Sequence, residues 1–213
     1  FIVGDLFDQP KIGNKKCTAN YMIETINKIF QCGKPVIILE GNHDQAPDYS
    51  ALQLLKGPII CNQPLVMEFT DYVGLIVPWM RNDSDYKNSV IEHLESFNEV
   101  VGGNKPRYLF GHINLAGANM SGNITVNPQS YFCFEEADFK NLDITAGFLG
   151  HLHERQTKGR FTDIGAMAQL NFGEEGNPPG VMIYNTSTNE AQYFAWPETP
   201  GYVTIDEFDS VEK

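Results

Sequence analysis

The sequence predicts an α/β fold, a layered β-sandwich flanked by helices. The first half of the chain alternates strand-like and helical patterns, and the second half consists mostly of short strand-like runs between Gly, Asn and Pro turns. The chain has 213 residues, of which 42% are hydrophobic, and this is enough for one domain with a substantial core. We therefore expect one domain over residues 1–196, with the acidic residues 197–213 as the start of a further domain.

The expected elements follow from the spacing of apolar residues. Helices are expected at residues 18–31 and around residues 90–97, where apolar side chains recur at helical spacing, including Val90, Ile91, Leu94 and Phe97. Strands are expected where apolar or β-branched runs lie between turn residues, at 1–3, 36–39, 65–69, 73–77, 108–110, 147–149, 161–164, 181–184 and 191–196. Because the chain opens in mid-strand at Phe1, we also expect a segment upstream of it.

Composition excludes several classes of protein. No run of about 18 or more apolar residues occurs, and the first residues do not resemble a secretory signal, so we expect a cytoplasmic protein that has no membrane partner. The cysteines are widely separated and form no CxxC pair, which favours free thiols over a disulfide framework or a zinc site. The net charge of −12 argues against a broad basic surface for nucleic acid, although metal ions or a basic partner would offset it.

One pattern repeats along the chain: an apolar run, a glycine and then a potential metal ligand. It occurs at Gly4-Asp5, Gly41-Asn42-His43-Asp44, Gly111-His112 and Gly150-His151-Leu152-His153. The carboxyl ends of parallel strands gather functional groups at one edge of a sheet, so these side chains are expected to meet. Carboxylate, amide and imidazole ligands suit Mn²⁺, Fe or Zn²⁺, and two such ions form a phosphoesterase centre.

Each motif alone has a simpler interpretation. A lone GDxxD or GNHD is usually a turn, because Asp and Asn favour turns, and His151 and His153 could both face one side of a strand or both reach one site from a turn. The repetition of the pattern favours a site. His93 lies among Glu92, Glu95 and Ser96 and is expected to be a surface residue outside it.

At these motifs the sequence resembles the calcineurin-like metallophosphoesterases, whose pattern is DxH, GDxxD, GNH[D/E], GH and GHxH; the last four are present. Three longer stretches resemble the SbcD type of DNA repair exonuclease within that superfamily: GDLFDQP at 4–10, GHINLAGANMSGN at 111–123 and IGAMAQLNFGEEGNPPGVMIY at 164–184. The resemblance extends to about Trp196 and implies a calcineurin-like metallophosphoesterase fold.

The resemblance also implies two divalent metal ions, with Mn²⁺ expected. Asp5 would bridge both ions, Asn42, His112 and His151 would complete the shell of the second ion, and His153 would bind the first. The DxH motif that should complete the first ion's shell is absent from the sequence, and its expected place is upstream of Phe1. We therefore expect one ion to bind tightly and the other weakly, with impaired hydrolysis.

Three residues would act without binding metal. The resemblance implies that His43 stabilises a phosphoryl oxygen or protonates the departing sugar oxygen, with Asp44 orienting its ring. Asp8 would position substrate or water, and a surface turn is the equally weighted alternative.

Several further residues have two interpretations. Arg155, Lys158 and Arg160 are expected either to contact phosphates or to form a solvated turn. Glu174 and Glu175 either match a landmark of the family or form a polar turn between strands. Trp79 and Phe134 either line a substrate groove or belong to the core.

The resemblance implies a DNA exonuclease and endonuclease subunit for double-strand-break processing or recombination. It would act on DNA with an SbcC-like ATPase subunit and form a homodimer. Two alternatives stay open at this point: a phosphoesterase for small phosphodiesters or phosphoproteins, and a non-catalytic fragment that retains the fold.

Overall fold

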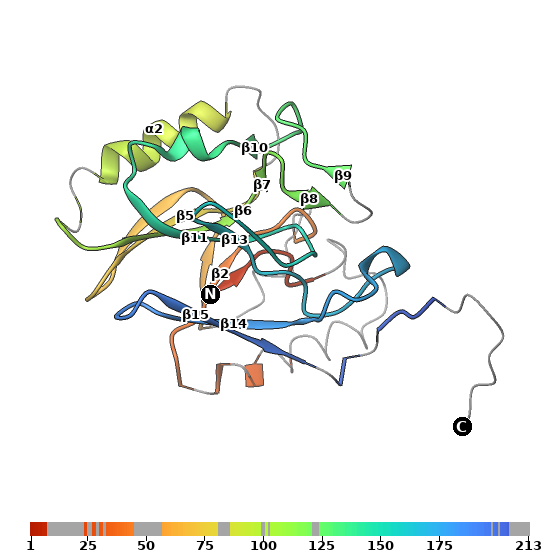
Figure 1. Ribbon diagram of the computed structural model, residues 1–213. Helices are drawn as coiled ribbons and strands as arrows, with labels where there is room; N and C mark the ends of the chain where they lie inside the picture. The colour runs from red at the N-terminus through yellow and green to blue at the C-terminus, as the bar shows by residue number, and fades with distance from the viewer. Residues whose placement is uncertain are drawn as a thin grey trace, which may run out of the picture.

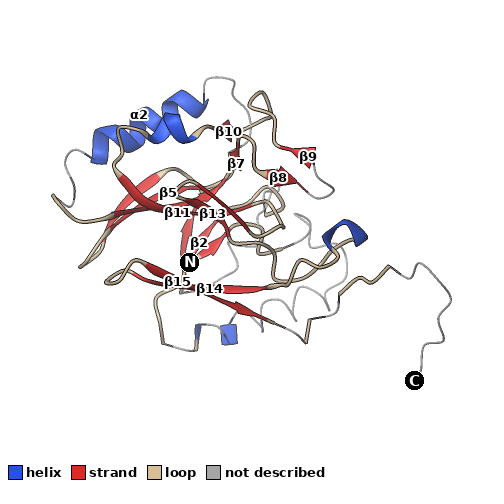
Figure 2. Ribbon diagram, in the orientation of Figure 1, coloured by secondary structure: helices blue, strands red, loops and turns tan. Residues whose placement is uncertain are grey.

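The protein has a mixed α/β fold, with many strands and few helices (Figures 1 and 2). The computed structural model describes residues 1–7, 24, 27–28, 30–31, 33–44, 57–80, 86–98, 101, 103–120, 124–196, 198–199 and 201–204. Its strands are β1 (Ile2–Val3), β2 (Ile37–Leu39), β3 (Ile59–Cys61), β4 (Leu65–Glu68), β5 (Val73–Val77), β6 (Arg107–His112), β7 (Asn114–Leu115), β8 (Asn119–Met120), β9 (Ile124–Thr125), β10 (Cys133–Phe134), β11 (Ile144–Gly150), β12 (Gln156–Lys158), β13 (Phe161–Asp163), β14 (Gly180–Asn185) and β15 (Glu190–Ala195). The helical elements whose bounds the structure describes are α2 (Tyr86–Asn98) and the 3-10 turns η2 (Glu136–Phe139) and η3 (Phe172–Glu174).

The largest sheet has six strands in the order β12-β13-β11-β6-β5-β4. Its four central strands run parallel, and β12 and β4 pair antiparallel at the two edges. A second, three-stranded sheet has the parallel order β1-β2-β3. In the large sheet His112 pairs with Gly150, so two of the sequence motifs end side by side.

Alternate residues of the central strands face two separate cores. Leu75 and Leu109 pack on one face of the large sheet with Val90 and Leu94 of α2. The neighbouring residues Ile76 and Phe110 point the other way and pack against Val3 and Leu39 of the three-stranded sheet. This alternation follows from the two-residue period of a strand, and Figure 1 shows α2 and the β14–β15 hairpin on opposite sides of the large sheet.

All nine strands expected from the sequence are present. The run at 73–77 is β5 itself, and the runs at 1–3, 36–39, 65–69, 161–164, 181–184 and 191–196 match strands within one residue at each end. The runs at 108–110 and 147–149 are longer than expected, because β6 continues to His112 and β11 begins at Ile144. Strand β3 and the short strands β7 to β10 and β12 were not expected.

The expected apolar face of the second helix is partly wrong. Phe97 is 50% exposed, whereas Asn98 is buried on the core side of α2. The physical reason is Arg107, whose buried guanidinium donates from Nε to Asn98 Oδ1 and from Nη1 to the Lys105 carbonyl. A buried cation needs such acceptors, and they replace an apolar contact at this point.

Other expectations fall partly outside the described residues. Of the helix expected at 18–31, the structure describes residues 24, 27, 28 and 30 as helical and residue 31 as a turn, and the other residues of that range are not described. Cys61 and Cys133 are buried free thiols, as expected, and Cys17 and Cys32 lie outside the described residues. Among the residues searched, no helix is long and apolar enough to span a membrane. The domain boundary at 196 stays a prediction, and residues 205–213 are not described.

Asp163 is a buried acid whose environment makes folding stability depend on pH. It is 2% exposed, and within the described part of the chain its Oδ1 has no hydrogen-bond partner. Burial raises the pKa of Asp163 to about 8, because an unpaired charge is costly there. A raised pKa in the folded state means that stability is fully present below about pH 4 and is lost as pH rises toward 8.

We therefore predict that Asp163→Asn increases the free energy of unfolding at pH 8 by roughly 1–3 kcal/mol relative to the unmodified protein. The difference should shrink as the pH is lowered toward 5, since the natural side chain is then protonated. Urea unfolding at several pH values measures this. A pH-independent difference would contradict the account.

Candidate metal centre

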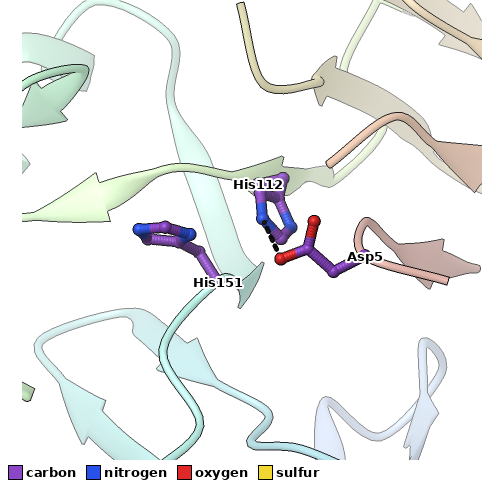
Figure 3. A group of neighbouring side chains, drawn as sticks. All are labelled: Asp5, His112 and His151. Atoms are coloured by element: carbon purple, nitrogen blue, oxygen red, sulfur yellow. Dashed lines mark ion pairs between the residues drawn. The ribbon is translucent and has the colours of Figure 1, made fainter. Parts of the chain in front are cut away.

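The carboxyl ends of β1, β2, β6 and β11 meet at one place, and four of the expected ligands follow them. Ligand atoms of Asp5, His112 and His151 all lie within 4.8 Å of one another (Figure 3). Asn42 joins this group, because its Oδ1 lies 2.9 Å from His112 Nε2 and 3.0 Å from His151 Nδ1. Residues far apart in the sequence are thus assembled as the repeated motif predicted.

His112 is the buried centre of the group. It is 0% exposed at the end of β6, and its Nδ1 lies 2.7 Å from the Val3 carbonyl oxygen. Because a carbonyl only accepts, Nδ1 must carry the hydrogen. Nε2 is thereby turned toward Asn42 Oδ1 and toward Asp5 Oδ2, which lies 3.1 Å away.

Asp5 lies in a left-handed turn directly after β1, with a φ of 50°. Its Oδ1 accepts a 2.8 Å hydrogen bond from the His43 backbone N–H, and its Oδ2 faces His112. Burial alone would raise the pKa of Asp5, but the hydrogen bonds and charges of His112 and His43 outweigh it and leave the pKa lowered. Asp5 is therefore an ionised carboxylate at neutral pH.

His151 also has a left-handed backbone, with a φ of 88°. Burial, followed by the neighbouring His112, lowers the pKa of His151 to about 4, so the ring is neutral at pH 7. The Trp79 ring lies 4.7 Å from it, centroid to centroid, and 6.0 Å from the His112 ring. The neutral His151 imidazole, which packs against the Trp79 ring, has a nitrogen lone pair available for a cation.

The donor set fits a divalent cation. With hydrogen on Nδ1, a neutral His112 ring presents the lone pair of Nε2 to two oxygen acceptors at 2.9 and 3.1 Å. Lone pairs that face one another repel, so this arrangement requires a positive charge between them, either a second proton or a metal ion. One carboxylate, one amide oxygen and two imidazoles suit a borderline ion such as Mn²⁺ or Zn²⁺.

His43 and His153 border the same site without joining the close group. Both line a cavity of about 640 Å³ that also contains Asp5, His112 and His151. His153 Nδ1 lies 2.8 Å from Glu174 Oε1. The turn after β11 thus brings both His151 and His153 to one cavity.

Asp44 joins two of the ligand-bearing loops. It is 1% exposed and accepts hydrogen bonds from the backbone N–H groups of Gly41, Phe7 and Leu6. Burial, followed by these amides, sets its pKa, and the net direction is upward. This contact set gives Asp44 a structural role; its orienting role toward His43 stays a prediction. Asp8 lies outside the described residues.

The remaining sequence candidates divide between surface, core and site. Arg160 pairs with Glu136, and Arg155 lies over the Tyr193 ring, as in a structured surface turn. Phe134 is fully buried in the core, whereas Trp79 lies against His112 and His151.

Glu174 is the residue whose role the sequence did not indicate. It is a buried carboxylate bonded to His153. In the sequence, only its place in the FGEEG run at residues 172–176 drew attention to Glu174.

Comparison with known proteins gives one distant sequence relative. "Exonuclease subunit 1" of Enterobacteria phage T4 is 21% identical over 201 residues, which cover 89% of this chain and 53% of that protein. The chain spans about half the length of this curated relative.

No protein-family model matches the chain. Among solved structures, the phosphopantetheinyl hydrolase PptH from Mycobacterium tuberculosis aligns with a TM-score of 0.45 and 14% identity over 77% of each chain. At that TM-score the likeness supports no conclusion about function.

Gly4 is required for the close approach of β1 to His112. It has a φ of 88°, and a Cβ added there would overlap the His112 ring. We predict that Gly4→Ala destabilises the protein by more than the roughly 1–3 kcal/mol of left-handed strain alone and weakens metal binding.

Gly33→Ala is the matched control, because Gly33 has a φ of 70° but open space around its Cα. Thermal unfolding and metal titration of both variants measure the difference. Equal losses would contradict a steric role for Gly4.

Metal stoichiometry tests the ligand assignment. Among the described residues, our assignment gives Asp5, Asn42, His112 and His151 to one ion and Asp5 and His153 to a second, so we predict one tight Mn²⁺ per chain in isothermal titration. Asn42→Ala should weaken that site by about tenfold or more. The exposed Asn141, which bonds Glu95, provides the control Asn141→Ala. Two tight sites, or an unaffected Asn42→Ala variant, would count against this assignment.

Proposed function

We propose that the protein is a metal-dependent DNA phosphodiesterase, an exonuclease and endonuclease subunit for double-strand-break processing or recombination. The observation that carries the proposal is the convergence of Asp5, His112 and His151 with Asn42 at the ends of parallel strands. A carboxylate beside amide and imidazole groups is the ligand chemistry that metal-dependent phosphoester hydrolysis uses.

Two further observations support this proposal. The distant relative is an exonuclease subunit, and its match covers 89% of the chain rather than one motif. The three-stranded and six-stranded sheets share a buried core, which suits the layered calcineurin-like metallophosphoesterase fold that the sequence predicts.

The residues divide into metal ligands and a proton donor. We assign Asp5, Asn42, His112 and His151 to one cation, and Asp5 with His153 to a second. Cations held by these residues, expected to be Mn²⁺, would supply the positive charge that polarises a phosphate and acidifies a water. Burial opposes the charge of Asp5, but His112 and then His43 outweigh it and lower its pKa, and the His43 backbone amide also ties its loop to Asp5.

His43 is assigned the proton transfer. Its side chain lines the cavity, and its backbone is held by Asp5, 2.8 Å away. An imidazolium there would stabilise a phosphoryl oxygen and then protonate the departing sugar oxygen. Asp44, which is tied to Gly41 and Phe7, would hold the loop that presents His43.

The proposed partners of the protein rest on its net charge and on the name of its phage T4 relative. The net charge of −12 leaves DNA binding in need of positive charge from metals or from a second protein. The relative's name describes a subunit. We therefore propose that the protein acts on DNA together with an SbcC-like ATPase, and that it forms a homodimer.

A second candidate function is hydrolysis of small phosphodiesters or phosphoproteins. The acidic net charge and the 640 Å³ cavity favour it, because a cavity of that size holds a small ligand.

Cleavage assays separate the two functions. We predict Mn²⁺-dependent cutting of linear and hairpin DNA, reduced about 10²- to 10⁴-fold by His43→Ala. His93→Ala is the matched control, since His93 lies on α2 against Phe97. Because only Asp5 and His153 are assigned to the second cation among the described residues, the assay uses millimolar Mn²⁺.

Turnover of bis-p-nitrophenyl phosphate without DNA cleavage would favour the second candidate. Equal activity in the His43→Ala and His93→Ala variants would contradict the role of His43. A lack of turnover of either substrate at saturating Mn²⁺ would contradict both candidate functions.

A further inference from the structure

We propose that Glu174 is a positioning residue that fixes the imidazole of His153 with its hydrogen on Nδ1, so that the Nε2 lone pair faces the cavity as a ligand for a divalent cation. This inference rests on the proposed metal-dependent function and deepens it.

The Glu174 carboxylate is built into the protein rather than exposed on a turn. Its side chain is 4% exposed, although η3 lies in a largely exposed loop. Oε2 accepts a 2.9 Å hydrogen bond from the Leu170 backbone, and Oε1 accepts a 2.7 Å hydrogen bond from Asn171 Nδ2. Burying a carboxylate is costly, and these two hydrogen bonds offset part of that cost while they fix the orientation of the carboxylate.

The third partner of the carboxylate is His153. Oε1 lies 2.8 Å from His153 Nδ1. A carboxylate that already receives two obligate donors acts as an acceptor, so Nδ1 carries the hydrogen in this pair. A neutral ring with its hydrogen on Nδ1 has its lone pair on Nε2, and within the described part of the chain the hydrogen bond of the ring is that of Nδ1.

The same loop also holds the backbone of His153. Asn177 Nδ2 and the Ala166 backbone N–H both donate to the His153 carbonyl oxygen. Asn177 N in turn donates to the Glu174 carbonyl oxygen at 3.0 Å. The loop therefore restrains both the main chain and the ring of one histidine, which a simple polar turn has no need to do.

His112 provides an internal precedent. Its Nδ1 donates to the Val3 carbonyl, and its Nε2 faces the proposed cation position. His153 has the same arrangement, with a carboxylate in place of the carbonyl. An acceptor behind a metal-binding imidazole fixes its tautomer and orientation and makes the ring a stronger ligand.

The test compares Glu174→Gln with Glu175→Gln. Gln has nearly the same size as Glu. If the Gln amide oxygen accepts from Leu170 N, as Glu174 Oε2 does, then the amide NH₂ faces His153 Nδ1 and donates to it. Glu175 lies in the same loop and bonds exposed Thr204, so its variant controls for loop effects. Glu174→Ala adds a variant in which the side chain at position 174 can neither accept nor donate a hydrogen bond.

The readouts are imidazole ¹⁵N shifts of His153 in the metal-free protein, followed by titration with Zn²⁺. We expect the Nδ1–H tautomer in the unmodified protein and in Glu175→Gln, and a shift toward the Nε2–H tautomer in Glu174→Gln. Zn²⁺ should perturb His153 Nε2, with an affinity about ten- to a hundredfold weaker in Glu174→Gln.

Two outcomes would overturn the inference. One is an unchanged His153 tautomer in a folded Glu174→Gln protein, which would leave Glu174 a loop-stabilising role only. The other is binding of Zn²⁺ at His112 and His151 with no response at His153 Nε2. Either can occur while DNA cleavage is normal, so failure of the inference is distinguishable from failure of the proposed function. Conversely, the absence of both nuclease and phosphodiesterase activity, alongside the expected tautomer shift and Zn²⁺ response, would overturn the function and leave the positioning of His153 intact.

Discussion

The hydrogen bond between His112 Nδ1 and the Val3 carbonyl, 2.7 Å long and buried, connects the end of the large sheet to the end of the small one. It orients the ring so that Nε2 points at Asp5 and Asn42. The strand ends approach this closely because glycine stands where they meet; a Cβ on Gly4 would overlap the His112 ring, and one on Gly150 would overlap the Val3 carbonyl oxygen. The ligand set therefore depends on backbone packing as much as on the ligands themselves.

The sequence predicted the strands and the convergence of four polar side chains well because both depend on local patterns. The β-branched run before Gly41 and the apolar run before Gly111 are strands β2 and β6. The glycine-ligand repeat placed Asp5, Asn42, His112 and His151 together because the carboxyl ends of parallel strands share an edge. The contacts confirm that neighbourhood. Whether the residues bind metal stays a prediction.

What the sequence missed depends on contacts between distant residues. Nothing in the pattern around Phe97 and Asn98 shows that Arg107 occupies the core beside α2. Glu174 was noticed only within the FGEEG run, because its meaning comes from His153, 21 residues earlier in the chain. Asp44 was assigned to His43 from the motif, whereas its described hydrogen bonds join Gly41 to the loop after β1. Short strands such as β7 and β10 have only two residues and leave no periodic pattern.

The central claim is that Asp5, Asn42, His112 and His151 bind a divalent cation between them. Anomalous diffraction from a crystal soaked in Mn²⁺ tests this most directly. The account predicts an anomalous peak about 2.0–2.3 Å from Asp5 Oδ2, Asn42 Oδ1, His112 Nε2 and His151 Nδ1. A Mn²⁺ peak elsewhere, with a direct His112–Asp5 hydrogen bond retained at this position, would contradict it.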